Sequence, residues 1–388
     1  RSRGLGDVYK RQIQDHIGGY TTAAFDNLMN FSSHMDHLVR GFEFYINVTR
    51  TSKSIHHHVR GDEINKRLIP WIREHKNERF FLFVHYWDPH TPYNQPEEYR
   101  HIFHHEPGNL EDLVVKEAPA GYRYVPGWGR VGELWEPSPD EDKPTIDLYD
   151  GEIRYVDHLI GEVFEVLEDL KIADETIIII TSDHGEQLGQ HGIYEHGGLH
   201  EAVIHIPLII WAPSILPSGV VVEGYVQQAD IAPTILDLLG ADEKILKGFD
   251  GMTLIPIIRG ERKARNEIFI ENHEERAVLS NEWKYIRNYF ERTEELYNIR
   301  EDPMEVINLA SEKSDLTQKM KDKLLKWVRK ELGNKTDPMW LQMAKWNDEW
   351  IRRFGRDPAG LKPKPTLIKG INYATKPERD RSSTNRSN

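Results

Sequence analysis

A carboxylate and an imidazole stand next to each other at Asp183 and His184, directly after four consecutive isoleucines at 177–180. Carboxylate oxygens and imidazole nitrogens both bind divalent cations, and the imidazole favours transition metals over strictly hard ions. An uninterrupted apolar run is typical of a strand buried on both faces. In open α/β sheets, ligands bind in the crevice outside the carboxyl ends of the strands. The pair is therefore predicted to bind a divalent cation at a strand end.

Histidines in two other segments could complete such a site. His90 follows an apolar run at 80–84 that ends in the same way, and His196 lies in a glycine-flanked segment shortly after Asp183. Imidazoles beside a cation can bind an oxyanion and pass protons to a leaving group near neutral pH. We predict that both histidines line one cavity with the metal pair. The simpler alternatives are that His90 is hydrogen-bonded to the loop backbone and that His196 caps a turn.

Hydrophobic periodicity predicts the elements that position these residues. Strands are expected at 19–25, 80–84, 177–180 and 208–211, and helices at 59–75, 145–171 and 230–240. Asp230 is the expected amino-terminal cap of the last helix, and Gly240 its end. Helices that alternate with buried strands are typical of a largely parallel or mixed sheet covered by helices. Further short strands at 267–270, 276–280 and 284–288, with a helix at 316–332, predict a small antiparallel sheet.

The chain of 388 residues is long enough for a larger and a smaller domain. Residues 1–12 are basic, have no amphipathic period and are predicted to be a non-native leader. The α/β domain is expected at 13–260, the antiparallel α+β subdomain at 261–335 and an extended tail at 336–388. A long loop at 94–143 is rich in Pro, Gly and aromatic residues, which is typical of a lid or binding loop. Its Trp128 and Trp135 are expected to pack the loop onto the body, and the alternative is that they stack on a sugar ring of a carbohydrate ligand.

Composition excludes several classes of partner and chemistry. The net charge of −13 and the pI near 5.8 make the surface unattractive to nucleic acid and to anionic membranes. No apolar run approaches the roughly 20 residues that cross a bilayer, so no membrane span is predicted. The chain has no cysteine, which excludes disulfides, thiolate ligands and a cysteine nucleophile within it.

With these residues in view, the chain resembles the sulfatases of the alkaline-phosphatase superfamily over most of its length. The resemblance rests on separated pieces that share the family's order and spacing. These are GYTTAAF at 19–25, FFLFVHYWDPHTPY at 80–93, SDHGEQLGQHG at 182–192, HGGLHEAVIHIPLII at 196–210, DIAPTILDLLG at 230–240, DGMTLIPII at 250–258 and ELYNIREDPMEVINLA at 295–310. It implies an alkaline-phosphatase-like mixed β-sheet flanked by helices, with a smaller carboxyl-terminal antiparallel α+β subdomain.

The resemblance also implies a reaction. A hydrated formylglycine, the oxidised Cys or Ser of a C/S-x-P-x-R motif, cleaves a small-molecule or carbohydrate sulfate ester beside a divalent cation, calcium first, with manganese or zinc as alternatives. Asp183 and His184 map onto the second pair of metal ligands, where many members have Asn in place of the His. His90 maps onto the histidine that contacts the sulfate and the leaving-group oxygen. His196 stands where many members have a lysine that grips the sulfate.

The chain departs from the family pattern in three features that belong before Gly19. It has no cysteine, no Ser-x-Pro-x-Arg and no amino-terminal Asp-Asp strand for the other metal ligands. The family's Lys and His after the first strand fall at Asn27 and Met29. We expect that the chain is an amino-terminally truncated fragment, inactive as written, of an active parent.

Two other functions stay open at this point. A phosphonate monoester or phosphodiester hydrolase on the same scaffold is favoured by His184 and His196. A catalytically inactive member that binds sulfated glycans would use the same cavity without turnover. The compartment is also left open.

Overall fold

The fold is known from a computed structural model. It describes residues 19–27, 41–49, 59–91, 93–104, 124–125, 129–130, 145–188, 190–192, 194–289, 292–333, 335–339 and 341. The chain divides into unit 1, residues 1–112, 137–183 and 207–264, and unit 2, residues 113–136, 184–206 and 265–388. The predicted leader, the tail beyond residue 341 and most of the long loop lie outside the described residues. The predicted domain boundaries stay a prediction.

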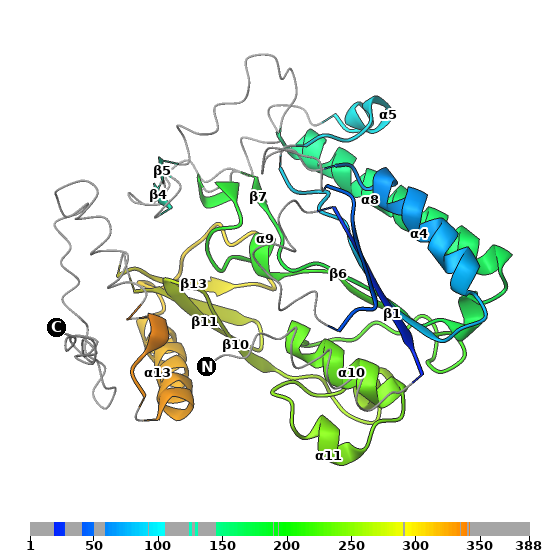
Figure 1. Cartoon of the computed structure of the whole chain (residues 1–388). Coiled ribbons are helices and arrows are strands. Elements are labelled where there is room, and N and C mark those ends of the chain that lie inside the picture. Colours follow the sequence, from blue (N-terminus) through cyan, green and yellow to red (C-terminus); the bar gives the residue numbers. More distant parts are fainter. Residues whose placement is uncertain are drawn as a thin grey trace, which may run out of the picture. The chain divides into compact units, whose positions relative to one another are not determined.

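A parallel sheet organises unit 1 (Figure 1). Its central strand β1 (Thr21–Asp26) pairs with β2 (Phe44–Asn47) on one side and with β3 (Phe80–His85) on the other. Because all pairs are parallel, the carboxyl ends of the three strands meet at one edge. Asp26 stands there in register with the last residues of β2 and β3.

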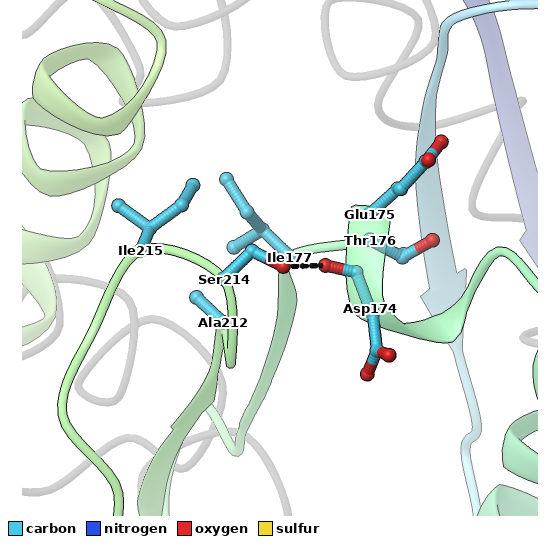
Figure 2. A pocket seen from close by; sticks show the side chains of 7 residues that line it. All are labelled: Asp174, Glu175, Thr176, Ile177, Ala212, Ser214 and Ile215. Carbon is cyan, nitrogen blue, oxygen red and sulfur yellow. Dashed lines mark hydrogen bonds between the residues drawn. The ribbon is translucent and has the colours of Figure 1, made fainter.

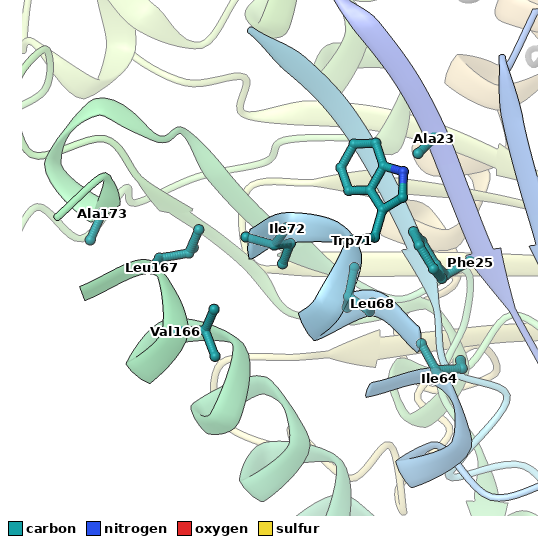
Figure 3. Packing of buried hydrophobic residues seen from close by; sticks show 9 residues of the cluster. All are labelled: Ala23, Phe25, Ile64, Leu68, Trp71, Ile72, Val166, Leu167 and Ala173. Atoms are coloured by element: carbon teal, nitrogen blue, oxygen red, sulfur yellow. The ribbon is translucent and has the colours of Figure 1, made fainter. Parts of the chain in front are cut away.

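Two long helices, α4 (Asp62–His75) and α8 (Thr145–Asp169), run side by side along this sheet (Figure 1). Apolar residues three or four positions apart form one stripe of α4, and Val166 and Leu167 of α8 join them in a core with Ala23 and Phe25 of β1. Figure 3 shows this core, whose members are Ala23, Phe25, Ile64, Leu68, Trp71, Ile72, Val166, Leu167 and Ala173. Burying one large apolar side chain contributes about 1.5–3 kcal/mol, so the helices hold the sheet firmly.

The isoleucine strand β6 (Ile178–Thr181) pairs antiparallel with β9 (Leu208–Trp211). The prediction that it is buried on both faces was wrong for the described residues, because its isoleucines are half-buried and Ile209 of β9 is 56% exposed. Ile178 packs against the core of unit 1. Among the described residues, β6 pairs with β9 in a two-stranded sheet. The apolar run therefore predicted the strand correctly but overestimated how deeply it is buried.

The helix predicted at 230–240 is α10 (Ile231–Leu238), and Gly240 follows it with a φ of +78°. Asp230 precedes the helix, but its side chain does not cap it. Its carboxylate accepts hydrogen bonds from the backbone N–H groups of Gln227 and Met252 instead, at 2.8 Å each. The residue therefore ties two loops to the start of the helix.

Short elements complete the described parts of both units. They are α5 (Glu97–Arg100), β4 (Tyr124–Val125), β5 (Gly129–Arg130), η1 (Ala173–Glu175), β7 (Gln187–Leu188), η2 (Gln190–Gly192), β8 (Tyr194–Glu195), α9 (Glu201–Ile204), η3 (Gln228–Asp230), α11 (Glu243–Leu246) and α12 (Ile255–Ile258).

An antiparallel meander forms the body of unit 2, as the spacing of short strands predicted. Its strands are β10 (Glu267–Glu271), β11 (Glu275–Ser280), β12 (Trp283–Asn288) and β13 (Glu294–Asn298), in that order. The helix α13 (Ser314–Leu332) packs its apolar stripe on the sheet. Their shared core contains Val278, Tyr285, Leu296, Met320 and Leu324. The fold class, mixed α/β with a carboxyl-terminal antiparallel sheet, is confirmed.

One buried ion pair allows a stability prediction. Arg276 donates to both carboxylate oxygens of Asp337, at 2.7 and 2.8 Å, and the two side chains are 2% and 5% exposed. Replacing Asp337 by Ala leaves a buried guanidinium without this partner, and we expect unit 2 to lose about 3–5 kcal/mol of stability in urea unfolding. The matched control is Asp322→Ala on the exposed face of α13, for which a change within about 0.5 kcal/mol is expected. Equal effects of the two changes would contradict this account.

Candidate active site

Asp183 lies two residues beyond the end of β6, in a turn whose backbone is held by Gln228. The side-chain amide of Gln228 donates to the carbonyl oxygens of Ser182 and Asp183, at 2.9 and 2.8 Å. The Asp183 side chain is exposed. A carboxylate on a fixed backbone can meet a cation without the cost of burying its charge first.

His184 presents the form of imidazole that binds a metal. Its Nδ1 lies 2.9 Å from the carbonyl oxygen of Gly185. Because a carbonyl oxygen only accepts, Nδ1 carries the proton and the lone pair of the neutral ring is on Nε2. A metal-ligating histidine usually donates its other ring N–H in this way, which fixes the orientation of the ring.

Within unit 2, His184 lies beside His196 and Glu186. The two imidazole rings stack with centroids 4.4 Å apart, and a carboxylate oxygen of Glu186 lies 3.9 Å from Nδ1 of His196. One ligand atom from each of the three residues lies within 4.8 Å of the others. Two nitrogens and one oxygen at this spacing form a donor set that suits a borderline transition metal such as zinc. Glu186 was missed in the sequence, although it stands only two residues after His184.

A close backbone approach explains the glycine between these ligands. The N–H of Gly185 donates to the carbonyl oxygen of Val203 at 2.7 Å, and a Cβ at Gly185 would lie 2.1 Å from the carbonyl oxygen of Ala202. Only glycine fits there without a shift of the backbone. The turn that carries His184 and Glu186 is therefore seated directly on the short helix α9.

Buried charges tie α9 to the meander of unit 2. Lys284 of β12 is 0% exposed and lies 3.0 Å from a carboxylate oxygen of Glu201 and 2.7 Å from one of Glu305. Burial raises the pKa of Glu201, but hydrogen bonds from His205 and Lys284 outweigh it and bring the pKa to about 2. The carboxylate therefore stays charged at neutral pH, and the ion pairs fix the segment that follows His196.

A pair of stacked histidines lies in the same buried region. The rings of His191 and His200 have centroids 3.9 Å apart, and His200 Nε2 lies 3.0 Å from a carboxylate oxygen of Glu295. Burial, followed by the effect of His200, lowers the pKa of His191 to about 4. His191 is thus neutral at physiological pH and donates through Nε2 to the carbonyl oxygen of Glu305 at 2.9 Å. Both histidines support the segment.

In unit 1, the carboxyl edge of the parallel sheet holds a second polar cluster. Asp26 is buried and accepts hydrogen bonds from the hydroxyl of Tyr45 and the amide of Asn47, at 2.6 and 2.7 Å. Nδ1 of His85 lies 2.9 Å from the same carboxylate. The register of β1 with β2 and β3 puts Asn47 and His85 opposite Asp26. Asp26 was not recognised in the sequence.

Asn27 connects this edge to the loop that carries His90. Its amide donates to Asp88 at 2.8 Å and to the carbonyl oxygen of Val59 at 2.6 Å, while its carbonyl accepts from the backbone N–H of Trp87 at 2.6 Å. The peptide bond between Asp88 and Pro89 is cis. A buried, saturated amide therefore sets the start of the loop.

His90 is held by its neighbours in the loop. Its ring stacks on Trp87 with centroids 4.1 Å apart, and its Nδ1 donates to the carbonyl oxygen of Thr91 at 2.6 Å. The backbone hydrogen bond that the simpler interpretation expected is present. Because it uses Nδ1, the lone pair of the neutral ring is on Nε2, the atom that would carry a proton to or from a substrate.

The sequence model of the family described as Sulfatase matches residues 2–241. The chain belongs to the sulfatase family. A second family model, described as N-sulphoglucosamine sulphohydrolase, C-terminal, matches residues 189–330. The recognition of the alkaline-phosphatase superfamily is confirmed by these matches.

Two curated relatives show the extent of the likeness. The choline-sulfatase of Rhizobium meliloti (strain 1021) is 30% identical over 260 residues, which cover 63% of this chain and 50% of that protein. The uncharacterized sulfatase YidJ of Escherichia coli (strain K12) is 28% identical over 281 residues, which cover 69% and 55%. This sulfatase-family chain therefore spans about half the length of the curated relatives it matches.

Solved structures share the fold. The complex of BT4656 with its substrate D-glucosamine-2-N,6-O-disulfate has a TM-score of 0.63 and 20% identity, and the match covers 83% of this chain and 81% of that one. The phosphonate monoester hydrolase of Agrobacterium radiobacter has a TM-score of 0.59 and 21% identity, with 86% and 81% covered. At these identities the likeness supports the sulfatase fold and does not choose a substrate.

The predicted site residues fall in both units. His90 and Asp183 belong to unit 1, and each follows a strand at its carboxyl end, whereas His184 and His196 belong to unit 2 and stack on each other. The convergence of all four into one cavity stays a prediction.

A small cavity of about 100 Å³ lies at the other end of β6 (Figure 2). It is lined by residues 174–177, Ala212, Ser214 and Ile215, and the Ser214 hydroxyl donates to the carbonyl oxygen of Asp174 at 2.6 Å. Ligand pockets usually have volumes of about 300–1,000 Å³. The cavity is too small for a substrate and lies before the strand, whereas Asp183 follows it.

No described helix is both long and apolar enough to span a bilayer.

Proposed function

We propose that the protein hydrolyses sulfate esters with the help of a divalent cation held by Asp183 and His184. The observation that carries the proposal is the imidazole of His184, which follows the Asp183 carboxylate at the end of β6 and directs its lone pair through Nε2. Family membership supplies the class of reaction. The nucleophile is proposed to be a formylglycine outside these 388 residues.

In the family the cation neutralises charge on the reacting group. The residues of this chain would bind the cation, contact the sulfate and transfer the proton. Asp183 and His184 would bind the cation, and the imidazole of His184 favours a transition metal such as manganese or zinc, whereas the resemblance favours calcium. His196 would contact the sulfate oxygens, and His90 would move a proton between Nε2 and the leaving-group oxygen.

A carbohydrate substrate is the favoured class. The second family model is named for a sulphohydrolase of a sulfated glucosamine, and the BT4656 complex holds a disulfated glucosamine. The acidic chain as a whole also fits a small sulfated sugar better than a long anionic surface.

The test compares aryl sulfate with aryl phosphonate esters in the longest natural form of the protein. We expect faster release from the sulfate ester, loss of the activity with a chelator and recovery with one cation of the series calcium, manganese and zinc. Faster cleavage of the phosphonate ester would favour the phosphonate hydrolase, which His184 and His196 also allow. If the protein binds sulfated glycans but does not turn them over with any of these cations, the proposal that it is a hydrolase is rejected.

A further inference from the structure

Glu152 of α8 is a buried carboxyl group that the proposed reaction does not use. The side chain is 0% exposed. Its Oε1 accepts a hydrogen bond from the backbone N–H of Asn94 at 2.5 Å, while its buried Oε2 has no hydrogen-bond partner among the described residues. A buried polar atom without a partner is unusual in a folded protein and calls for an explanation.

The segment that Glu152 holds begins four residues after His90. The Gln95 side chain, also buried, donates to the carbonyl oxygen of Leu148 at 2.9 Å. One turn along the helix, a Cβ at Gly151 would lie 2.7 Å from the carbonyl oxygen of Tyr99. The helix α8 therefore fits closely against residues 94–99 on two adjacent turns.

The loop that carries His90 is thus fixed at two points within unit 1. Asn27 holds Trp87 and Asp88 at its start, and Glu152 holds Asn94 at its end. Between these points, His90 has its ring on Trp87. Loss of the second point would remove the hydrogen bond that fixes the carboxyl-terminal side of this loop.

The charge state of Glu152 decides how firmly this residue holds Asn94 at the end of the loop. Burial is the main cause that raises the pKa of Glu152 to about 8, and the negative charge of Asp88 adds to it. The amides of Asn94 and Gln95, and the charge of Arg60, act in the opposite direction. The carboxyl is therefore uncharged at neutral pH, which removes the cost of a buried charge on the unpartnered Oε2.

We infer that Glu152 is a positioning residue whose uncharged carboxyl fixes the loop of His90, and whose ionisation releases that loop at alkaline pH. The inference depends on the proposed function only for the role of His90. Its structural test needs no turnover, so the two can fail separately.

The direction of the pH dependence follows from linkage. The folded segment binds the proton of Glu152 up to about pH 8, whereas the opened segment loses it near the ordinary value of 4.5. The proton therefore stabilises the closed segment fully below pH 4.5, and this stabilisation is lost as the pH rises from 4.5 to about 8. Over this range the opening constant rises about tenfold per pH unit.

Hydrogen exchange of the 388-residue chain tests this, with protection factors compared between about pH 6 and 8. In the wild type, we expect protection of residues 93–99 to fall about tenfold per pH unit, and that of α10 to change much less. Glu152→Gln keeps an acceptor for Asn94 and cannot ionise, so its protection should stay level. Glu165→Gln, on the exposed face of the same helix, should behave as the wild type.

Equal pH slopes in the wild type and Glu152→Gln would overturn the inference, as would equal losses of protection in residues 93–99 and α10. If Glu152→Gln does not fold, the wild-type comparison of these two segments decides alone. In the active protein, Glu152→Gln should also extend activity on esters with basic leaving groups to higher pH, because His90 stays in place.

Discussion

Alanine in place of Asp183 is expected to lower the cation-dependent hydrolysis of a sulfate ester by on the order of 10² to 10³-fold or more. The carboxylate is the proposed negative ligand next to His184, and its backbone is fixed by Gln228, which donates to the carbonyl oxygen of Asp183. The loss should appear as a weaker affinity for the cation together with a lower kcat. Steady-state rates over a cation titration measure both.

Asp174→Ala is the matched control for this change. Asp174 is an exposed aspartate before β6, whereas Asp183 follows the same strand, so both changes remove one surface charge. The control should keep wild-type rates and cation affinity. A rate for Asp183→Ala within about twofold of the control would remove Asp183 from the site.

Alanine in place of His90 is expected to affect substrates according to their leaving groups. Proton donation from Nε2 matters most when the departing oxygen is basic, and general acid catalysis is worth about 10² to 10⁴-fold. We therefore expect a loss of this size on a sulfated sugar and a much smaller loss on an activated aryl sulfate. A plot of log kcat/KM against the pKa of the leaving group should become steeper in the variant.

His101→Ala provides the control, since His101 is an exposed histidine of the same region that pairs with Glu97. It should leave the slope unchanged. Equal losses on both classes of substrate in His90→Ala would mean that the histidine only maintains the loop, as its hydrogen bond to Thr91 allows.

Local patterns predicted most of the elements. The apolar run at 80–84 and the stripe of α8 depend on residues close in the chain, and both appear at nearly the expected bounds. The strands β2 and β13 were missed. Apolar and aromatic residues in FYIN and EELYN were the available signals, but each strand is short and is completed by pairing with a distant neighbour.

The candidate site was only partly predictable for a related reason. Asp183, His184, His90 and His196 stand next to strand ends or glycines, which are visible in the sequence. The groups that support them are not. Lys284 meets Glu201 across 83 residues, and Asp26 meets His85 across 59. No local pattern encodes such pairs, because the two partners are far apart in the sequence and are brought together by the fold.

The central claim is that Asp183 and His184 bind one cation, with His90 and His196 facing the anion beside it. The most direct test is anomalous diffraction from crystals of the longest natural form with Mn²⁺ and sulfate. The account predicts a manganese peak roughly 2.0–2.5 Å from an oxygen of Asp183 and from Nε2 of His184, and a sulfate in contact with both other histidines. A manganese peak elsewhere, or the four side chains pointing into different cavities, would contradict it.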